Sequence, residues 1–194
     1  MLPTKLPIYL ASKSPRRRKL LKQINIPFKS FSVDLHEEVL DGEHPVKTVK
    51  RLSEQKLLLA EEKIDKGIII TADTIVVLDK EIIGKPEDEN EAAATIKKLS
   101  GRTHNVYTGF ALKNVGTKRK IIDYEKTAVT FRNLTEKEIS DYVRSGSPMD
   151  KAGAYGIQDD FGAVFVTKIS GCYYNVVGLP LSKVYKNLLD IIET

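Results

Sequence analysis

Two apolar runs in the first half of the chain have the length and composition of buried strands. Residues 8–11 form a short run, and residues 68–78 form a nearly continuous β-branched run, typical of a strand covered on both faces. Between them, apolar residues recur at the three-to-four-residue spacing of a helix: Val49, Leu52 and Ala60. We expect this helix to begin at Pro45 and to end at Gly67, and a strand over residues 28–35. Strands and helices therefore alternate here.

The second half of the chain combines long strands with three helices. The expected elements are a helix over 88–99 ended by Ser100-Gly101, strands over 103–112 and 120–131, a capped helix from Thr135, strands over 165–169 and 173–177, and a helix over 181–192. Cys172, the only cysteine, precedes the last of these strands and is expected to be a half-buried strand residue rather than a nucleophile. One cysteine also excludes an intramolecular disulfide and a zinc site built on cysteines.

Composition narrows the class of protein. With 194 residues, of which 41% are hydrophobic, the chain can bury a proper core. No run is long enough to span a bilayer and the N-terminus has no apolar signal-peptide region, so a cytoplasmic location without membrane association is expected. The net charge is only +5, and acidic residues are interspersed with basic ones, which argues against nucleic acid as a partner and favours a small polyanion.

A candidate anion site lies where the first strand ends. Ser14 stands where a helix N-cap belongs and Pro15 where the first helical residue belongs, so we expect the helix to begin at Pro15. Three arginines follow, at positions 16–18. Cations in a first turn oppose the helix dipole, whereas the unpaired N–H groups there attract anions. The three arginines could also form an ordinary solvated basic face, but the sequence favours a phosphate site. The residues match neither a Walker loop nor the GxGxxG motif.

Two charged residues interrupt otherwise apolar patterns. Lys56 falls on or beside the apolar face of the helix that begins at Pro45, where its ammonium must either extend to water or meet an anion. Asp73 stands in the middle of the apolar run 68–78, where a carboxylate is costly to bury unless it is paired, protonated or bound to a cation. Although a lone aspartate is often a turn residue, we favour chemistry for Asp73 and an anionic partner for Lys56.

Residues 150–158 are mostly small and include two glycines, one tyrosine and Gln158. Small residues let a ligand approach the backbone closely, and an amide can both donate to and accept from a polar ring edge. An ordinary glycine-rich loop has the same composition. Both interpretations stay open on residue types alone.

Six segments in order along nearly the whole chain closely resemble the Maf family of nucleoside triphosphate pyrophosphatases. They are Leu10-Ala11-Ser12-Lys13-Ser14-Pro15-Arg16-Arg17, Ala72-Asp73-Thr74, Gly84-Lys85-Pro86, Leu99-Ser100-Gly101 with His104 and Thr108-Gly109, Asp150 through Gln158, and Val176-Val177-Gly178-Leu179-Pro180-Leu181. The resemblance implies one Maf-like domain over residues 1–194, of the α/β class. Its elongated mixed sheet would be flanked by helices, with two lobes and a central cleft, as in inosine triphosphate pyrophosphatases.

The activity implied by the resemblance is hydrolysis of a nucleoside triphosphate between its α- and β-phosphates, with release of pyrophosphate. The enzyme would need Mg²⁺ or Mn²⁺, form a homodimer and remove unwanted nucleotides. The segment ending in Tyr155-Gly156-Ile157-Gln158 is similar to the subfamily that acts on dTTP, UTP and modified pyrimidine nucleotides. The alternatives are an enzyme of the 7-methyl-GTP type and a non-catalytic nucleotide-binding regulator of septum formation.

The resemblance also implies roles for individual residues. The triphosphate would be held by Ser12, Arg16 and Arg17, while Lys56 and Lys85 would neutralise charge on the leaving pyrophosphate. Asp73 would be the general base or a metal ligand, and Glu37 the second carboxylate on the metal. Substrate would be oriented by Thr74 and Gln158, with Gln158 on the base edge.

The sequence departs from the family pattern directly after Gln158. Asp159, Asp160, Phe161 and Gly162 follow there, where a glycine is expected next to the glutamine. Two additional carboxylates would either bring in a metal ion or repel phosphate, and both interpretations stay open. The departure affects the expected substrate preference more than the expected reaction.

Overall fold

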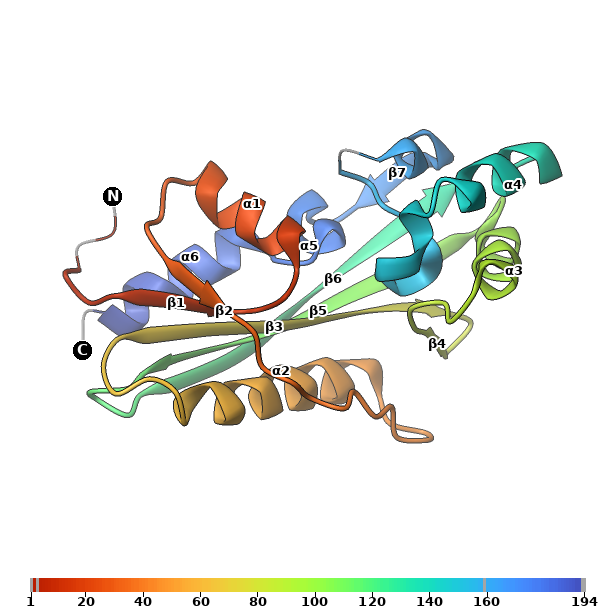
Figure 1. The fold of residues 1–194 in the computed structure, drawn as a ribbon. Helices are drawn as coiled ribbons and strands as arrows, with labels where there is room; N and C mark the ends of the chain where they lie inside the picture. The colour runs from red at the N-terminus through yellow and green to blue at the C-terminus, as the bar shows by residue number, and fades with distance from the viewer. Residues whose placement is uncertain (1, 3, 159, 193–194) are drawn as a thin grey trace. The chain divides into compact units, whose positions relative to one another are not determined.

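The structure, a computed structural model, describes residues 2, 4–158 and 160–192 and comprises two compact units (Figure 1). The first unit contains Met1–Asp73, Thr108–Glu125 and Gly178–Thr194, and the second contains Thr74–Tyr107 and Lys126–Val177. Three long strands contribute residues to both units: β3 (Ile68–Leu78), β5 (Thr103–Asn114) and β6 (Lys120–Phe131). The expectation of a single domain stays a prediction.

The strands of the described residues form a mixed seven-stranded sheet in the order β2-β1-β3-β5-β6-β7, with β4 also paired to β3. The remaining strands are β1 (Ile8–Ala11), β2 (Lys29–Phe31), β4 (Glu81–Ile83) and β7 (Val166–Ser170). β1 runs parallel to both β2 and β3, whereas β4 is antiparallel to β3 and β7 to β6. The predicted α/β class with a mixed sheet is therefore confirmed.

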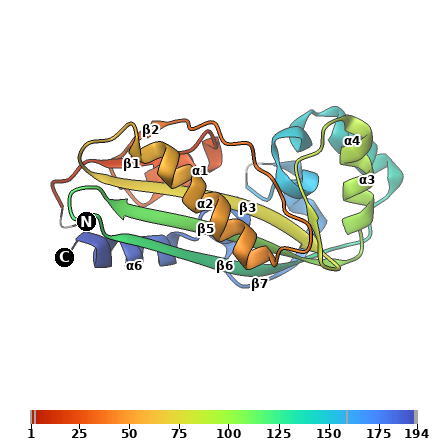
Figure 2. The same ribbon diagram turned by 90° about the horizontal axis from the view of Figure 1, so that it is seen from below.

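In the first unit, helices cover both faces of the sheet (Figures 1 and 2). α2 (Pro45–Glu61) covers one face, and α1 (Pro15–Gln23) and α6 (Leu181–Ile192) lie on the other. Apolar residues from α2, β1, β3 and β5 form a shared core, among them Ala11, Leu57, Ile69 and Ala111. At Gly109 of β5, a Cβ would lie 2.2 Å from the carbonyl oxygen of Val49, so the glycine lets α2 approach the sheet closely.

The second unit is built around an aromatic core. α3 (Glu89–Leu99) packs against α4 (Glu136–Arg144). The unit also contains shorter helices: the 3₁₀ helices Ser147–Asp150, Ala152–Ala154 and Phe161–Phe165, and the α-helix α5 (Tyr173–Val177). Phe131 meets both Tyr155 and Phe165 edge to face, with ring centroids 4.7 and 5.9 Å apart. His104 is fully buried against Phe131 and Tyr155.

Several predicted helix ends are confirmed. Ser14 caps α1 by accepting a hydrogen bond from the N–H of Arg17, and Pro15 is the first helical residue. Thr135 and Glu138 form a reciprocal capping box at the start of α4. α6 spans the predicted residues.

Four predictions about elements are wrong. α2 ends at Glu61, and Gly67 instead precedes β3 at a positive φ of 131°, where a Cβ would meet the carbonyl oxygen of Pro7. β2 has only three residues, because it pairs with β1 alone at the sheet edge. Residues 173–177 are helical, because Asn175 donates buried hydrogen bonds to Val106 and Thr127, and Cys172 lies outside any strand.

Among the described residues, no helix is both long and apolar enough to cross a membrane.

Candidate functional site

The N-terminus of α1 presents a fixed arginine in the first unit. The guanidinium of Arg17 donates from Nε to the carbonyl oxygen of Gly178 at 2.8 Å and from Nη1 to Oγ of Ser12 at 3.3 Å. Oγ of Ser12 also accepts the N–H of Ser14 at 3.2 Å, which fixes the turn between β1 and α1. The arginine is therefore oriented by protein groups at the start of a helix, where the positive end of the helix dipole attracts anions.

Burial and neighbouring charges shift the pKa of Arg17 in opposite directions. Burial lowers its pKa, Asp73 acts against this shift, and the neighbouring cation Arg16 adds to it, while Glu37 again raises the pKa. Arg17 therefore already shares an electrostatic environment with both carboxylates predicted to act in the site. Arg16 belongs to the same first turn and is partly exposed.

An ionic cluster joins β3, α2 and the acidic loop that carries Glu37, whose side chain is 39% exposed. Asp73 is 4% exposed in the middle of β3, and its Oδ1 accepts a hydrogen bond from Nζ of Lys56 at 2.5 Å. The same ammonium donates to Oε1 of Glu37 at 2.7 Å. Lys56 thus meets two anions instead of extending to water, which confirms the preferred interpretation of its position on the apolar face of α2.

The fold of α2 explains how Lys56 reaches the strand. Apolar residues on the same face of the helix are completely buried, and Oγ1 of Thr71 donates to the carbonyl oxygen of Ser53 at 2.7 Å. That bond fixes the helix one turn before Lys56 and two residues before Asp73. These contacts between helix and strand place Lys56 beside Asp73.

Arg51 anchors the acidic loop that carries Glu37, and sequence reasoning missed it. Its guanidinium donates to the carboxylate of Glu43 at 3.0 and 2.6 Å and to the carbonyl oxygen of Glu38 at 2.9 Å. The hydrogen bond with Glu43 raises the pKa of Arg51, and the same bond lowers the pKa of Glu43. The eight-residue separation of Glu43 and Arg51 across a helix start was the only sequence signal.

The cluster offers two carboxylates that could bind a hard divalent cation. Glu37 and Asp73 offer carboxylate oxygens, which Mg²⁺ and Mn²⁺ prefer, and no group of three or more His, Cys, Asp or Glu suited to a metal occurs among the described residues. Mg²⁺ is commonly held by one or two carboxylates together with substrate phosphates and water. Two carboxylates are therefore compatible with a metal that arrives with the substrate.

Three predicted site residues belong to the second unit. Thr74 follows Asp73 directly in β3, and Lys85 is exposed in the loop after β4. Gln158 is partly exposed and is the last residue of the glycine-rich segment, residues 150–158. The N–H of Gly153 donates to the carbonyl oxygen of Gly84 at 3.0 Å, so the segment that carries Gln158 is tied to the segment that carries Lys85.

The glycine-rich segment is also held against β3. Gly153 has a positive φ of 73°, and a Cβ there would lie 2.8 Å from Cγ2 of Val76. Gly156 is covered by Asp160, whose Oδ2 would lie 2.5 Å from a Cβ at this position. The two glycines are thus required by close approach, and the segment is a fixed part of the unit.

Asp160, which follows Gln158 by two residues, is held by hydrogen bonds from the protein. Its carboxylate is 4% exposed and accepts hydrogen bonds from the hydroxyl of Ser147 at 2.5 Å and the N–H of Gly162 at 2.9 Å. Both carboxylate oxygens therefore accept hydrogen bonds from the protein, and the two interpretations drawn from the sequence, a metal ligand or a charge that repels phosphate, stay open. Asp159 lies outside the described residues.

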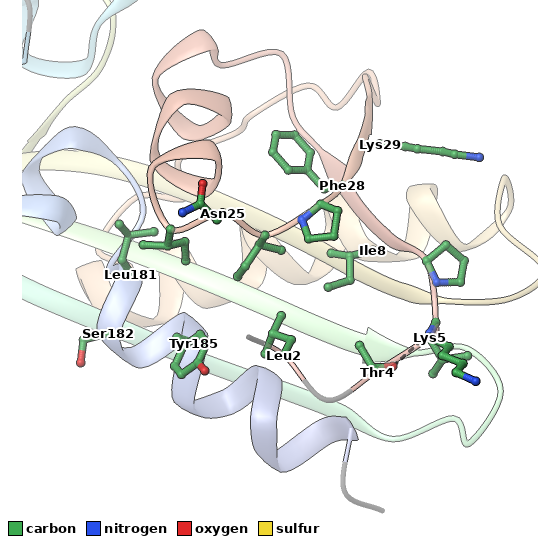
Figure 3. Close-up of a pocket in the computed structure, with 15 residues that line it drawn as sticks. Leu2, Thr4, Lys5, Ile8, Asn25, Phe28, Lys29, Leu181, Ser182 and Tyr185 are labelled. Atoms are coloured by element: carbon green, nitrogen blue, oxygen red, sulfur yellow. Dashed lines mark hydrogen bonds between the residues drawn. The ribbon is translucent and has the colours of Figure 1, made fainter.

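A large pocket in the first unit is separate from these residues (Figure 3). It has a volume of about 1180 Å³ and is lined by residues near the N-terminus, the 24–29 segment and the start of α6. Leu2, Ile8, Phe28 and Leu181 make much of its wall apolar, and its only charged lining residues are Lys5 and Lys29. Since none of the predicted site residues lines this pocket, it is not the candidate active site.

Taken together, the parallel βαβ start, the arginine at a helix N-terminus and the buried carboxylate–lysine cluster define an α/β protein equipped to bind a polyphosphate. A comparison with family models narrows this class, because the model described as "Maf-like protein" matches residues 7–191. The chain belongs to the Maf family.

Relatives with high similarity carry one name. The chain is 49% identical over 183 residues to "dTTP/UTP pyrophosphatase" of Carboxydothermus hydrogenoformans, covering 94% of this chain and 97% of that protein. It is 49% identical to the protein of the same name from Caldanaerobacter subterraneus subsp. tengcongensis, covering 92% and 86%. The Clostridioides difficile protein of this name is 44% identical, with 91% and 90% covered.

Proposed function

We propose that the chain is a nucleoside triphosphate pyrophosphatase that hydrolyses dTTP, UTP and modified pyrimidine triphosphates to the monophosphate and pyrophosphate. The names of the relatives support this substrate class. The observation that carries the proposal is the ammonium of Lys56 bound between the carboxylates of Asp73 and Glu37. A buried carboxylate with a fixed cationic partner is suited to act on water beside a phosphate chain.

In the proposed reaction, the oxygen of a water molecule forms a bond to the α-phosphorus, and the bridging bond to the β-phosphate breaks. The electron pair of that bond leaves with pyrophosphate. Ser12, Arg16 and Arg17 bind the phosphate oxygens at the start of α1, and Lys56 and Lys85 stabilise negative charge on the leaving group. Because charge increases on the leaving oxygen during bond cleavage, these cations favour the transition state over the ground state.

Asp73 has two possible roles in this reaction, and both are testable. As general base it takes the proton of the attacking water, so its loss removes the acidic limb of the pH–rate profile. As metal ligand it acts with Glu37, so its loss raises the Mg²⁺ or Mn²⁺ concentration needed for half-maximal activity. The metal ion, when bound, would polarise phosphate oxygens and neutralise their charge.

Thr74 and Gln158 orient the nucleotide. The uracil and thymine rings present an N–H donor between two carbonyl acceptors, and a glutamine amide complements one donor and one acceptor of that edge. Cytosine lacks this N–H donor. The amide oxygen of Gln158 is buried without a hydrogen-bond partner among the described residues, which supports a role in accepting a ligand donor.

The deciding experiment is pyrophosphate release from dTTP, UTP, CTP, GTP and 7-methyl-GTP, with Mg²⁺ and with Mn²⁺. Release limited to the uracil and thymine nucleotides supports the proposal. A preference for 7-methyl-GTP would instead favour the purine-directed type, and binding without release would favour the septum regulator. We also propose that the protein is cytoplasmic and forms a homodimer. Light scattering of the purified protein tests the homodimer.

A further inference from the structure

We propose that Asp160 is a positioning residue for substrate selection, which holds the segment 151–158 in the conformation that presents Gln158 to the base. The inference rests on the proposed function, because it assigns to Gln158 the recognition of the uracil or thymine ring. All residues that carry it belong to the second unit. Asp160 itself touches no substrate in this proposal.

The carboxylate of Asp160 joins four segments of the unit. It accepts from Ser147 of the first 3₁₀ helix, from the N–H of Gly162 and from the hydroxyl of Tyr142 in α4, and Nζ of Lys151 lies 3.3 Å from Oδ2. Burial by itself raises the pKa of Asp160, but these hydrogen bonds and the charge of Lys151 outweigh it and lower the pKa. Asp160 is therefore ionised in the neutral range and bonded from several sides.

The network extends from Asp160 into the glycine-rich segment through Tyr142. The Tyr142 hydroxyl donates to Asp160 and accepts the N–H of Gly156 at 3.1 Å. Gly156 itself lies against the carboxylate, since a Cβ there would come within 2.5 Å of Oδ2. Gly156 and Asp160 stand two residues before and two residues after Gln158, so the network holds the chain at these two positions.

The consequence for Gln158 follows from its buried amide oxygen. An acceptor that is buried without a partner among the described residues is kept in place only if its surroundings do not relax around it. The Asp160 network supplies that rigidity. If the network loosens, the amide rotates toward water or a protein donor, and the preference for a ring with an N–H donor is lost while phosphate binding is retained.

The test is Asp160→Asn, compared with Asp150→Asn as a matched control. Asp150 also pairs with Lys151, at 2.7 Å, but its side chain is 56% exposed. In pyrophosphate release assays, we expect Asp160→Asn to raise KM for UTP about tenfold with a much smaller change in kcat, and to lower the UTP-to-CTP ratio of kcat/KM by a similar factor. Asp150→Asn should leave both values unchanged.

Two further measurements separate positioning from general damage. Inorganic tripolyphosphate, which has no base, should inhibit the wild type and Asp160→Asn with the same inhibition constant. In a Gln158→Ala background, Asp160→Asn should have no additional effect on KM for UTP, because the two residues act on one interaction. An equal loss for UTP and CTP, a weakened tripolyphosphate constant or additive effects would each overturn the inference.

Tyr142→Phe keeps the inference testable if Asp160→Asn does not fold. It retains the buried ring and removes only the hydroxyl that joins Gly156 to Asp160, so the same change in selectivity is expected on a smaller scale. An unchanged UTP-to-CTP ratio in Tyr142→Phe would then overturn the inference. Failure of the proposed function looks different, because in that case the wild-type protein releases no pyrophosphate from any triphosphate.

Discussion

Each unit buries an aspartate beside a lysine, and the two aspartates are held in different ways. Asp73 is bonded to the ammonium of Lys56, which also binds Glu37, and Arg17 acts on it through charge. Asp160 is bonded mainly by neutral donors, from Ser147, Gly162 and Tyr142, with Lys151 more distant.

The kind of partner that each aspartate has indicates which of the two is suited to take part in a reaction. Partners that carry formal charge respond when a polyphosphate and a cation enter, because the new charges compete for the same side chains. Neutral O–H and N–H donors that are held in place by the surrounding helices and loops interact only weakly with incoming charges. A carboxylate bonded to such donors therefore keeps its partners and its protonation state. The first arrangement suits a reacting group, and the second suits a scaffold.

The largest effect expected from this comparison is that of Asp73→Asn. Removing the charge of a general base or metal ligand should lower kcat for UTP by about 10²- to 10⁴-fold while the fold is retained. The matched control is Asp34→Asn, because Asp34 pairs with Lys13 in the same unit but is exposed. Pyrophosphate release and circular dichroism measure the two properties, and near-native turnover in Asp73→Asn would contradict our assignment.

Lys85→Ala tests whether this exposed lysine contributes to catalysis. Loss of one cation that stabilises the leaving pyrophosphate should reduce kcat by about 100-fold. Lys80→Ala removes another exposed lysine, in the turn that precedes β4, and should have no such effect. If the two variants behave alike, Lys85 has no specific part in catalysis.

The aromatic core of the second unit should make its stability depend on pH. Burial lowers the pKa of His104 from 6.5 to about 4, so the unfolded chain binds the additional proton between these values. The stabilisation is complete above pH 6.5 and is lost as the pH falls toward 4, by about 2 to 3 kcal/mol.

Urea unfolding near pH 7.5 and near pH 4.5 measures this dependence. His104→Gln should show a smaller loss of stability on acidification than the wild type, whatever its stability at neutral pH. His36→Gln, at an exposed position of the first unit, should retain the wild-type dependence. If the free energy of unfolding changes with pH equally in the wild type and in His104→Gln, His104 is not the source of the pH dependence.

The smallest effect concerns the helix start that supports Arg17. Ser14→Ala removes the hydrogen bond that the side chain accepts from the N–H of Arg17 and should cost about 1 kcal/mol of unfolding free energy. Ser14→Asn, which retains a capping oxygen, should restore most of that loss. Thermal unfolding of the three proteins is sufficient, and equal stability would show that the cap is dispensable.

Local rules were enough to predict many parts of this protein. The Ser14-Pro15 start of α1, the Thr135 capping box and the buried strand around Asp73 each depend on residues close in sequence, so pattern and propensity identify them. The charged residues Lys56 and Asp73 were also recognisable, because each interrupts an apolar pattern where a lone charge is costly.

Only the tertiary structure decided which groups those charges meet. Glu37 reaches Lys56 because Arg51 anchors the acidic loop, and Asp160 is enclosed by donors from segments up to 18 residues away in sequence, counting from Tyr142. Residues 173–177 became helical because Asn175 finds buried acceptors on two strands. Contacts between distant segments outweigh local preference, since the free energy of burying and pairing a polar group exceeds the small difference between helix and strand propensities.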